Sequence, residues 1–265
     1  MVVEIVAFID AHIHLYSEEY HPRLQEILEE AYRRRVRTLI CAAEDYETSL
    51  QTLQISSQWR GFVYPVIGVH PWSTNQSLSD LEDTLSLILK YRDRLAGIGE
   101  TGLDRKYAGE EGEWRRQLEA FKAMIEASEK TSLPLVIHSR KSVDTILEVL
   151  ESSRVGKALF HWFSGDEGSL RRIMDMGYFV SFTPTITYSK RMQGLASRCD
   201  PSKVLSETDG PVPFYGKYKG VLTTPVMVID VVEKLAEIFS KSLEEMAEQI
   251  MDNAEDLFKL GLKTS

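Results

Sequence analysis

Asp10-Ala11-His12-Ile13-His14 is the stretch that decides the fold, and it follows the apolar run VVEIVAFI at residues 2–9. A run this short, rich in β-branched residues and almost wholly apolar, predicts a buried strand. Side chains on a strand alternate between two faces, so Asp10, His12 and His14 would point the same way if the extended conformation continues to residue 14. Two imidazoles and a carboxylate on one face can close on a metal ion. Two surface histidines just past a strand are the alternative that this stretch leaves open.

The composition is that of an ordinary folded protein, with 265 residues of which 43% are hydrophobic and 27% charged. An α/β barrel commonly fills this length as one domain, so we expect a single domain over residues 1–265. The net charge of -9 argues against sequence-independent wrapping of nucleic acid, which needs a basic surface. It is compatible with a nuclease, because bound divalent cations would offset the charge of an acidic cleft.

The two cysteines, Cys41 and Cys199, match neither a zinc-binding nor a redox spacing, which predicts structural thiols in a reducing compartment. The apolar N-terminus lacks a basic leader and carries Glu4, which indicates a core strand rather than a signal peptide. No apolar run reaches the roughly 18 residues of a membrane span. We therefore expect a cytoplasmic protein with no membrane contact.

Strand-like and helix-like segments alternate along the whole chain. Strands are predicted at residues 2–9, 36–41, 62–69, 95–99, 133–137, 157–160, 178–182 and 204–206. Helical patterns follow them at residues 22–35, 48–59, 78–91, 114–125, 142–150, 170–176, 190–198 and 225–239. Pro65 weighs mildly against the third strand, because proline cannot donate to a sheet ladder. The capping-box spacing of Ser242 and Glu245 opens a further helix, and Asn253 is expected to cap the last one.

Strands that alternate with helices pair in parallel, and eight such units in about 250 residues favour a closed barrel. The predicted fold class is therefore α/β, a single (β/α)8 TIM-like barrel with extra C-terminal helices. An open doubly wound sheet is the alternative, but the glycine-rich phosphate turn that usually follows its first strand is absent from this sequence.

Chemically active side chains gather at the ends of the predicted strands. These residues are His12, His14, His70, Glu100, His138, His161 and Asp209. In a barrel the C-terminal ends of the strands converge on one mouth, so these side chains would meet around one point. Three imidazoles beyond the first pair, with two carboxylates, exceed what one tetrahedral ion needs. Two ions bridged by a carboxylate would use them, and Glu100, between flexible glycines, is the expected bridge.

Six short motifs follow one another along the chain. They are Asp10-Ala11-His12-Ile13-His14, Gly68-Val69-His70-Pro71, Gly99-Glu100-Thr101-Gly102-Leu103-Asp104, Leu133-Pro134-Leu135-Val136-Ile137-His138-Ser139-Arg140, His161-Trp162-Phe163-Ser164-Gly165 and Glu207-Thr208-Asp209-Gly210-Pro211. In content and order they resemble the motifs of TatD-type metal-dependent deoxyribonucleases, which belong to the amidohydrolase-like metal-dependent hydrolases. The resemblance extends from the first strand to residues 253–258.

The resemblance implies a (β/α) barrel with one or two divalent metal ions, for which zinc, manganese and magnesium are the candidates. By position, the ligands of one ion would be His12, His14, Glu100 and Asp209. The ligands of the second would be Glu100, His138 and His161. Asp10 is expected to support these ligands rather than to be a main ligand.

The resemblance also implies hydrolysis of DNA phosphodiester bonds, often from a 3′ end as in a 3′–5′ exonuclease. Glu100 and Asp209 are the expected catalytic residues, with Asp209 as the candidate base for the attacking water. His70 would face the substrate phosphate, and Arg140 is a second expected substrate contact. The candidates for stacking on bases near the mouth are Trp72, Trp162, Phe163 and Tyr188, with core packing as the alternative, which is favoured for Phe163.

Late loops depart from the family pattern at Trp162, at Gly210 and at Thr223-Thr224-Pro225, which leaves the substrate more open than the metal site. The alternative function keeps the metal pair but hydrolyses a small ester, lactone, amide or phosphotriester, and the net charge of -9 favours such a small substrate. A barrel that only binds is disfavoured, because the ligand set is complete. The expected partners are DNA or a small-molecule ester as substrate, with no obligate protein partner.

Overall fold

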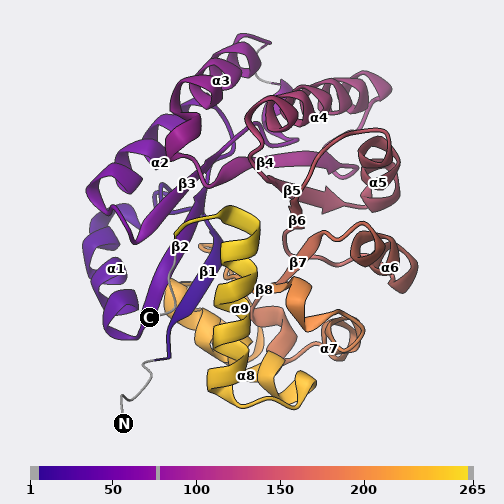
Figure 1. Cartoon of the computed structure of the whole chain (residues 1–265). Helices are drawn as coiled ribbons and strands as arrows, with labels where there is room; N and C mark the ends of the chain where they lie inside the picture. Colours follow the sequence, from indigo (N-terminus) through magenta and orange to yellow (C-terminus); the bar gives the residue numbers. More distant parts are fainter. Residues whose placement is uncertain (1–5, 76–77, 262–265) are drawn as a thin grey trace.

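The computed structural model describes residues 6–75 and 78–261. Within them, eight parallel strands follow one another in the order β1 to β8, and helices cover the outside of the sheet (Figure 1). The strands are β1 (Phe8–Ile13), β2 (Val36–Ala42), β3 (Val63–Ile67), β4 (Gly97–Asp104), β5 (Leu135–Arg140), β6 (Ala158–Phe160), β7 (Phe179–Phe182) and β8 (Val204–Ser206). The α-helices are α1 (Leu24–Arg33), α2 (Tyr46–Gln58), α3 (Leu78–Tyr91), α4 (Glu111–Thr131), α5 (Val143–Glu151), α6 (Glu167–Asp175), α7 (Lys190–Ala196), α8 (Val228–Phe239) and α9 (Leu243–Phe258).

The two ends of the sheet meet where β8 comes beside β1. The N–H of Asp209 donates to the carbonyl of His12 at 2.9 Å, and the N–H of His14 donates to the carbonyl of Gly210 at 2.9 Å. These bonds lie just beyond the C-terminal end of β8, and they bring the first and last motifs of the chain together. The predicted (β/α)8 barrel is confirmed, with α9 as the additional C-terminal helix in the described part of the chain.

Strands β1 and β4 are buried along their whole length, as expected of parallel strands with both faces covered. Polar side chains are unusual in such a place, because a buried polar group is costly unless it has a partner. On these two strands the buried polar residues are Asp10, His12, Glu100, Thr101 and Asp104. They mark the part of the barrel that serves chemistry rather than packing.

Of the differences from the predicted strand boundaries, those at β1, β4 and β5 bear on the candidate site residues. β1 begins at Phe8 and includes His12, whereas the predicted part at residues 2–5 lies outside the described residues. β4 and β5 continue past their predicted ends, so Glu100 and His138 lie within strands rather than after them. The glycines of β4 explain the extension, because a Cβ at Gly102 would lie 2.1 Å from the carbonyl oxygen of His138.

Pro65 lies inside β3 without disrupting the sheet. The first pair between β3 and β4 joins Val66 to Gly97, so Pro65 precedes the ladder on that side. Its carbonyl still accepts the N–H of Ala96 at 2.8 Å. The missing N–H of the proline therefore costs no ladder hydrogen bond with β4.

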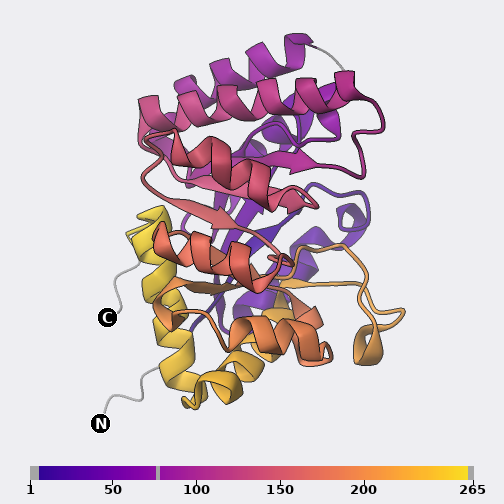
Figure 2. The same ribbon diagram turned by 90° about the vertical axis from the view of Figure 1, so that its right-hand side faces the viewer.

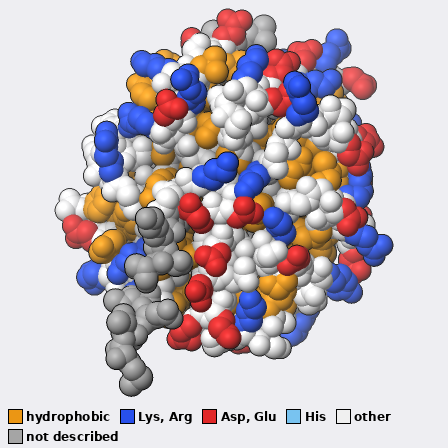
Figure 3. Space-filling model, viewed as in Figure 1, with side chains coloured by type: hydrophobic (Ala, Val, Ile, Leu, Met, Phe, Trp, Pro, Cys, Tyr) orange, Lys and Arg blue, Asp and Glu red, His pale blue; other side chains and the backbone are white. Residues whose placement is uncertain are grey.

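Helix α9 lies across the N-terminal end of the barrel, in front of the strands in Figure 1, and Figure 2 shows it at the edge of the molecule. Its predicted capping box is confirmed, since Ser242 Oγ accepts the N–H of Glu245 and Glu245 Oε2 accepts the N–H of Ser242. Acidic and basic side chains intermingle over this face (Figure 3). None of the helices in the described residues combines the length and apolarity needed to cross a membrane.

The prediction that Asn253 caps a helix was wrong. Asn253 lies within α9, where it is buried and its Nδ2 donates to the carbonyls of Pro201 at 2.7 Å and Val204 at 2.8 Å. One of these carbonyls lies just before β8 and the other at its first residue, and a carbonyl removed from water needs a donor. The asparagine supplies it and ties α9 to the barrel.

Replacing Asn253 with alanine is expected to lower the free energy of unfolding by about 2–3 kcal/mol, because one buried and one partly buried carbonyl lose their donor. Urea unfolding followed by circular dichroism would measure the change. Asp252→Ala is the matched control, since Asp252 is exposed on the same helix turn. A loss no larger for Asn253→Ala than for the control would contradict the assigned role.

Candidate metal centre

The barrel brings all seven predicted strand-end side chains into one cluster. Its members are His12, His14, His70, Glu100, His138, His161 and Asp209. All of them are buried except His138, which is partly exposed. Arg140, predicted as a substrate contact, is exposed at the end of β5 and is not part of the cluster.

One oxygen of Glu100 lies against a first group of donors. Glu100 Oε2 is 3.1 Å from His12 Nε2 and 3.5 Å from His14 Nε2. Asp209 Oδ1 is 3.2 Å from His14 Nε2 and 3.5 Å from His12 Nε2. The two imidazole nitrogens are themselves 3.3 Å apart. Two ring nitrogens and two carboxylate oxygens facing one another need a proton or a cation between them.

The other oxygen of Glu100 faces a second group. Glu100 Oε1 is 2.8 Å from His138 Nδ1, 2.8 Å from His161 Nε2 and 3.2 Å from His70 Nε2. The ring of His161 also stacks on that of His12, with centroids 4.0 Å apart, so the two groups adjoin. Glu100 is therefore the one side chain that touches every imidazole of the cluster.

Hydrogen bonds at the outer nitrogens determine which ring nitrogen offers a lone pair. His14 Nδ1 lies 3.0 Å from the carbonyl of Ala42, which can only accept, so we assign a hydrogen to Nδ1, and Nε2 offers its lone pair once its own proton is displaced. His138 Nε2 lies 2.9 Å from Asp104 Oδ2, so its Nδ1 turns a lone pair to the centre. Both rings are thus oriented to bind a cation at the nitrogen that faces Glu100.

His70 is arranged in the opposite way. Its Nδ1 accepts the backbone N–H of Trp72 at 3.2 Å, so the ring hydrogen is on Nε2, which faces Glu100. Burial lowers the pKa of His70 to about 4, so the ring is neutral near pH 7. His70 therefore presents a hydrogen-bond donor where its neighbours present lone pairs.

Charge in the cluster is balanced by proton sharing. Burial opposes ionisation of Glu100, but the facing imidazoles, His161 first, hold the pKa of its carboxyl well below the usual range. Burial also opposes the charge on His14, but the hydrogen bond to Asp209 and the charges of Glu44 and Asp209 raise its pKa to about 10. Imidazole nitrogens with carboxylate oxygens suit zinc, manganese or iron, and a divalent cation would replace the shared protons. The donors present therefore fit a metal centre.

Four further acids lie around the cluster. Asp10, which we expected to support the ligands rather than to be a main ligand, accepts the N–H of His12 at 3.3 Å and the N–H and Oγ1–H of Thr208 at 2.9 and 2.5 Å. Asp104 holds His138. Glu207 is fully buried and accepts the N–H of Trp162 at 2.7 Å and Ser181 Oγ at 2.5 Å.

The fourth acid, Glu44, lies two residues after β2, so it follows the strand-end rule, although a lone acid there gave no signal in the sequence. Its carboxylate accepts the hydroxyl of Tyr16 at 2.6 Å. One of its oxygens lies within 4.8 Å of donor atoms of His14 and Glu100. Burial raises the pKa of Glu44 to about 7.

Replacing Asp104 with alanine is expected to lower metal affinity or activity roughly 10- to 100-fold, the usual effect of removing the carboxylate behind a ligand histidine. The ring of His138 would lose the acceptor that fixes its orientation. Isothermal titration of Mn²⁺ into the metal-free protein would measure the affinity. Asp144→Ala, on the exposed side of α5, is the control, and equal affinities for both variants would contradict the role.

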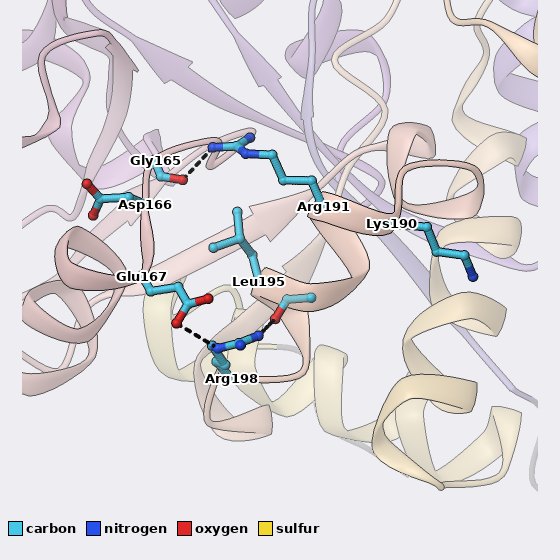
Figure 4. Close-up of a pocket in the computed structure, with 8 residues that line it drawn as sticks. Gly165, Asp166, Glu167, Lys190, Arg191, Leu195 and Arg198 are labelled. Atoms are coloured by element: carbon cyan, nitrogen blue, oxygen red, sulfur yellow. Dashed lines mark hydrogen bonds and ion pairs between the residues drawn. The ribbon is translucent and has the colours of Figure 1, made fainter.

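A separate recess of about 340 Å³ opens between the loop after β6 and α7 (Figure 4). Its lining residues are Gly165, Asp166, Glu167, Lys190, Arg191, Gly194, Leu195 and Arg198. Arg191 donates to the carbonyls of Ser164 and Gly165 at 2.6 and 2.7 Å. None of the clustered histidines lines this recess, so it is distinct from the candidate metal centre. Arg191 holds the loop that follows His161.

The chain matches known proteins over almost its full length. The family model described as TatD related DNase matches residues 9–259. Deoxyribonuclease TATDN3 from Homo sapiens is 30% identical over 262 residues, which are 96% of this chain and 95% of that protein. The uncharacterized metal-dependent hydrolase YabD from Bacillus subtilis is 27% identical over 258 residues, 95% of this chain and 99% of that protein.

Solved structures show the same fold. The crystal structure of YJJV, a TatD homologue from Escherichia coli K12, superposes with a TM-score of 0.86 at 24% sequence identity, covering 95% of this chain and 98% of that one. Fold and sequence thus agree, and the family match extends from β1 to the end of α9. The chain belongs to the family of TatD-related DNases.

Proposed function

We propose that the protein is a divalent-metal-dependent deoxyribonuclease that hydrolyses phosphodiester bonds of DNA. The observation that carries this proposal is the Glu100 carboxylate, whose two oxygens face two adjoining groups of imidazole nitrogens. A bridging carboxylate between two cation positions is the arrangement that phosphodiester hydrolysis uses. Membership of the family and the name of the human relative support DNA as the substrate.

The proposed ligands of the first cation are His12, His14, Glu100 and Asp209. The proposed ligands of the second are Glu100, His138 and His161. Divalent cations held there would supply Lewis-acid chemistry, which makes water a better nucleophile and neutralises charge on phosphate oxygens. Zinc and manganese suit the imidazole-rich set best, and magnesium suits the bridging carboxylate.

Two side chains are proposed to act on the reacting groups. Burial opposes the charge of Asp209, but the hydrogen bond and the charge of His14 lower the pKa of its carboxyl. Asp209 is therefore ionised near neutral pH and can accept the proton of the attacking water. His70 offers its Nε2–H to a phosphate oxygen. Arg140, exposed on the same strand as His138, is proposed to pair with a flanking phosphate.

We also propose that the protein removes nucleotides from the 3′ end of DNA and that it is located in the cytoplasm. Cys41 and Cys199 are both buried free thiols, and this supports a reducing compartment. All proposed ligands come from one chain, which supports the proposal that the reaction has no obligate protein partner. Hydrolysis of a small ester or lactone at the same centre is the competing function, and the net charge of -9 favours it.

The decisive experiment compares substrates on one metal-defined preparation. Protein stripped of metal and reloaded with Mg²⁺, Mn²⁺ or Zn²⁺ would be given oligonucleotides labelled at the 5′ or 3′ end, and a panel of esters, lactones and phosphotriesters. Metal-dependent shortening of DNA supports the proposal, and a ladder that shortens from the 3′ end supports the polarity. Turnover of esters or lactones with inert DNA would overturn it in favour of the competing function.

A further inference from the structure

Exposed aromatic side chains occur on loops that follow the strands at the mouth of the barrel. Trp72 follows β3 and is 41% exposed, Tyr188 follows β7 and is 39% exposed, and Tyr215 follows β8 and is 73% exposed. A single exposed ring on a protein surface needs no explanation, but a ring fixed beside a reactive centre does. Of these three rings, Trp72 is the one with a recorded contact to a histidine of the cluster.

Trp72 is held directly against the metal centre. Its ring centroid is 4.5 Å from that of His70, and its backbone N–H donates to His70 Nδ1 at 3.2 Å. His70 in turn reaches Glu100 Oε1 with its Nε2 at 3.2 Å. One imidazole therefore separates the exposed indole from the carboxylate at the centre of the cluster.

A second ring supports Trp72 from the side. Tyr107, in the loop after β4, meets the indole edge-to-face with centroids 5.5 Å apart. Held between Tyr107 and His70, the indole has little rotamer freedom to lose when it binds another ring. The large exposed fraction that remains is a rigid apolar surface at the edge of the centre.

In a nucleotide, one sugar separates the base from its phosphate. Here one imidazole, that of His70, separates the indole of Trp72 from the Glu100 carboxylate at the centre of the cluster. We infer that Trp72 stacks on the base of the nucleotide whose phosphate lies at the metal centre, while His70 contacts that phosphate. This inference rests on the proposed deoxyribonuclease function. Stacking is tolerant of sequence, because every base offers a flat face, so Trp72 contributes affinity and placement rather than sequence choice.

The other rings at the mouth are less suited to this position. The side chain of Trp162, the residue after His161, is only partly exposed and packs on Phe214, with centroids 5.6 Å apart. Tyr188 and Tyr215 contact each other, since the backbone N–H of Tyr215 donates to the Tyr188 hydroxyl at 3.4 Å. Their loops extend from the barrel at the end away from α9 (Figure 2). They therefore suit nucleotides farther from the scissile bond.

The test is a cycle that removes the protein ring and the DNA base separately and together. Wild type, Trp72→Leu and Trp72→Phe would cleave a single-stranded oligonucleotide carrying every base, and matched oligonucleotides lacking one base at each of the last three positions. With the intact oligonucleotide, Trp72→Leu is expected to raise KM roughly 5- to 100-fold, the loss of one stacked base, with a smaller change in kcat. Trp72→Phe keeps a ring and most of the affinity.

The informative result is the coupling between the two losses. Once the base that stacks on Trp72 is missing, Trp72→Leu and wild type are expected to have the same KM. Tyr32→Leu is the control, because Tyr32 is an exposed aromatic residue on α1, 52% exposed and outside the mouth loops. Equal KM increases on intact and base-lacking DNA would overturn the inference, since the indole would then act only by positioning His70. The inference would also be overturned if removal of the DNA base cancelled the effect of Tyr215→Leu on KM and left the effect of Trp72→Leu unchanged.

Failure of the inference is distinguishable from failure of the proposed function. If wild type cleaves DNA and Trp72→Leu has an unchanged KM, only the stacking is wrong. If wild type does not cleave DNA, the proposed function is wrong. In that case fluorescence anisotropy of the same oligonucleotides with Mn²⁺-loaded protein still decides the stacking, because equal affinities of wild type and Trp72→Leu would overturn it.

Discussion

Glu100→Gln is expected to lower the rate of DNA cleavage roughly 10³-fold or more, on the scale of losing a central catalytic group. Glutamine has the same shape as glutamate, but it carries no charge and places an NH₂ group beside imidazole nitrogens. The two shortest contacts of Glu100, to His138 Nδ1 and His161 Nε2 at 2.8 Å, would lose a bridging anion. Bound metal measured by mass spectrometry is expected to fall together with kcat.

Glu119→Gln is the matched control, because Glu119 is exposed on α4, the helix that packs on β4. It removes the same charge from the neighbourhood without touching the cluster, and wild-type activity and metal content are expected. Normal metal content and a normal rate in Glu100→Gln would show that the bridging role is wrong. Circular dichroism of both variants would separate loss of the centre from loss of the fold.

Removal of the metal is expected to abolish DNA cleavage and to lower the midpoint of thermal unfolding by about 10 °C. A ligand present at 1,000 times its Kd stabilises a protein by about 4 kcal/mol, and each kcal/mol shifts the midpoint by about 2–4 °C in a chain near this size. The measurement is calorimetry of chelator-treated and reloaded protein. Glu100→Gln, which has lost its bridge, is expected to respond much less.

The difference in thermal unfolding midpoint between metal-loaded and metal-free protein is expected to widen as the pH rises. In the metal-free protein the pKa of His14 is about 10, above the usual 6.5, so the stability it contributes is complete below pH 6.5 and is lost as the pH rises toward 10. Metal must displace that proton, so metal affinity rises over the same pH range. Calorimetry at pH 6, 7.5 and 9 would test this. A difference that stays constant with pH would contradict proton displacement from the ligands.

Much of the fold could be predicted because the apolar periods of its strands and helices are local. The gathering of the proposed ligands at one place could also be predicted, since parallel strands of a barrel end at the same mouth. His12 and Asp209 are far apart in sequence, yet both follow this rule. Glu44 follows it too, but a lone acid after a strand carries no signal without neighbours of the same kind.

What escaped prediction depends on contacts between segments distant in the chain. Asn253 has the sequence character of a helix cap, and only the carbonyls at the start of β8 show why it is buried within α9. Asp104 lies in a recognisable motif, but its role comes from the ring nitrogen of His138 on the neighbouring strand. The hydrogen bonds of Asp10 to Thr208 could not be predicted either, because they join the first strand to the segment that follows the last one.

The bonds that join His12 to Asp209 and His14 to Gly210 have a consequence for biosynthesis. His14 is made 195 residues before Asp209, and both are proposed ligands of the first cation. A nascent chain therefore holds an incomplete ligand set until all eight strands and Asp209 have been made. We expect a chain that ends before Asp209 to leave the nucleic acid around it intact.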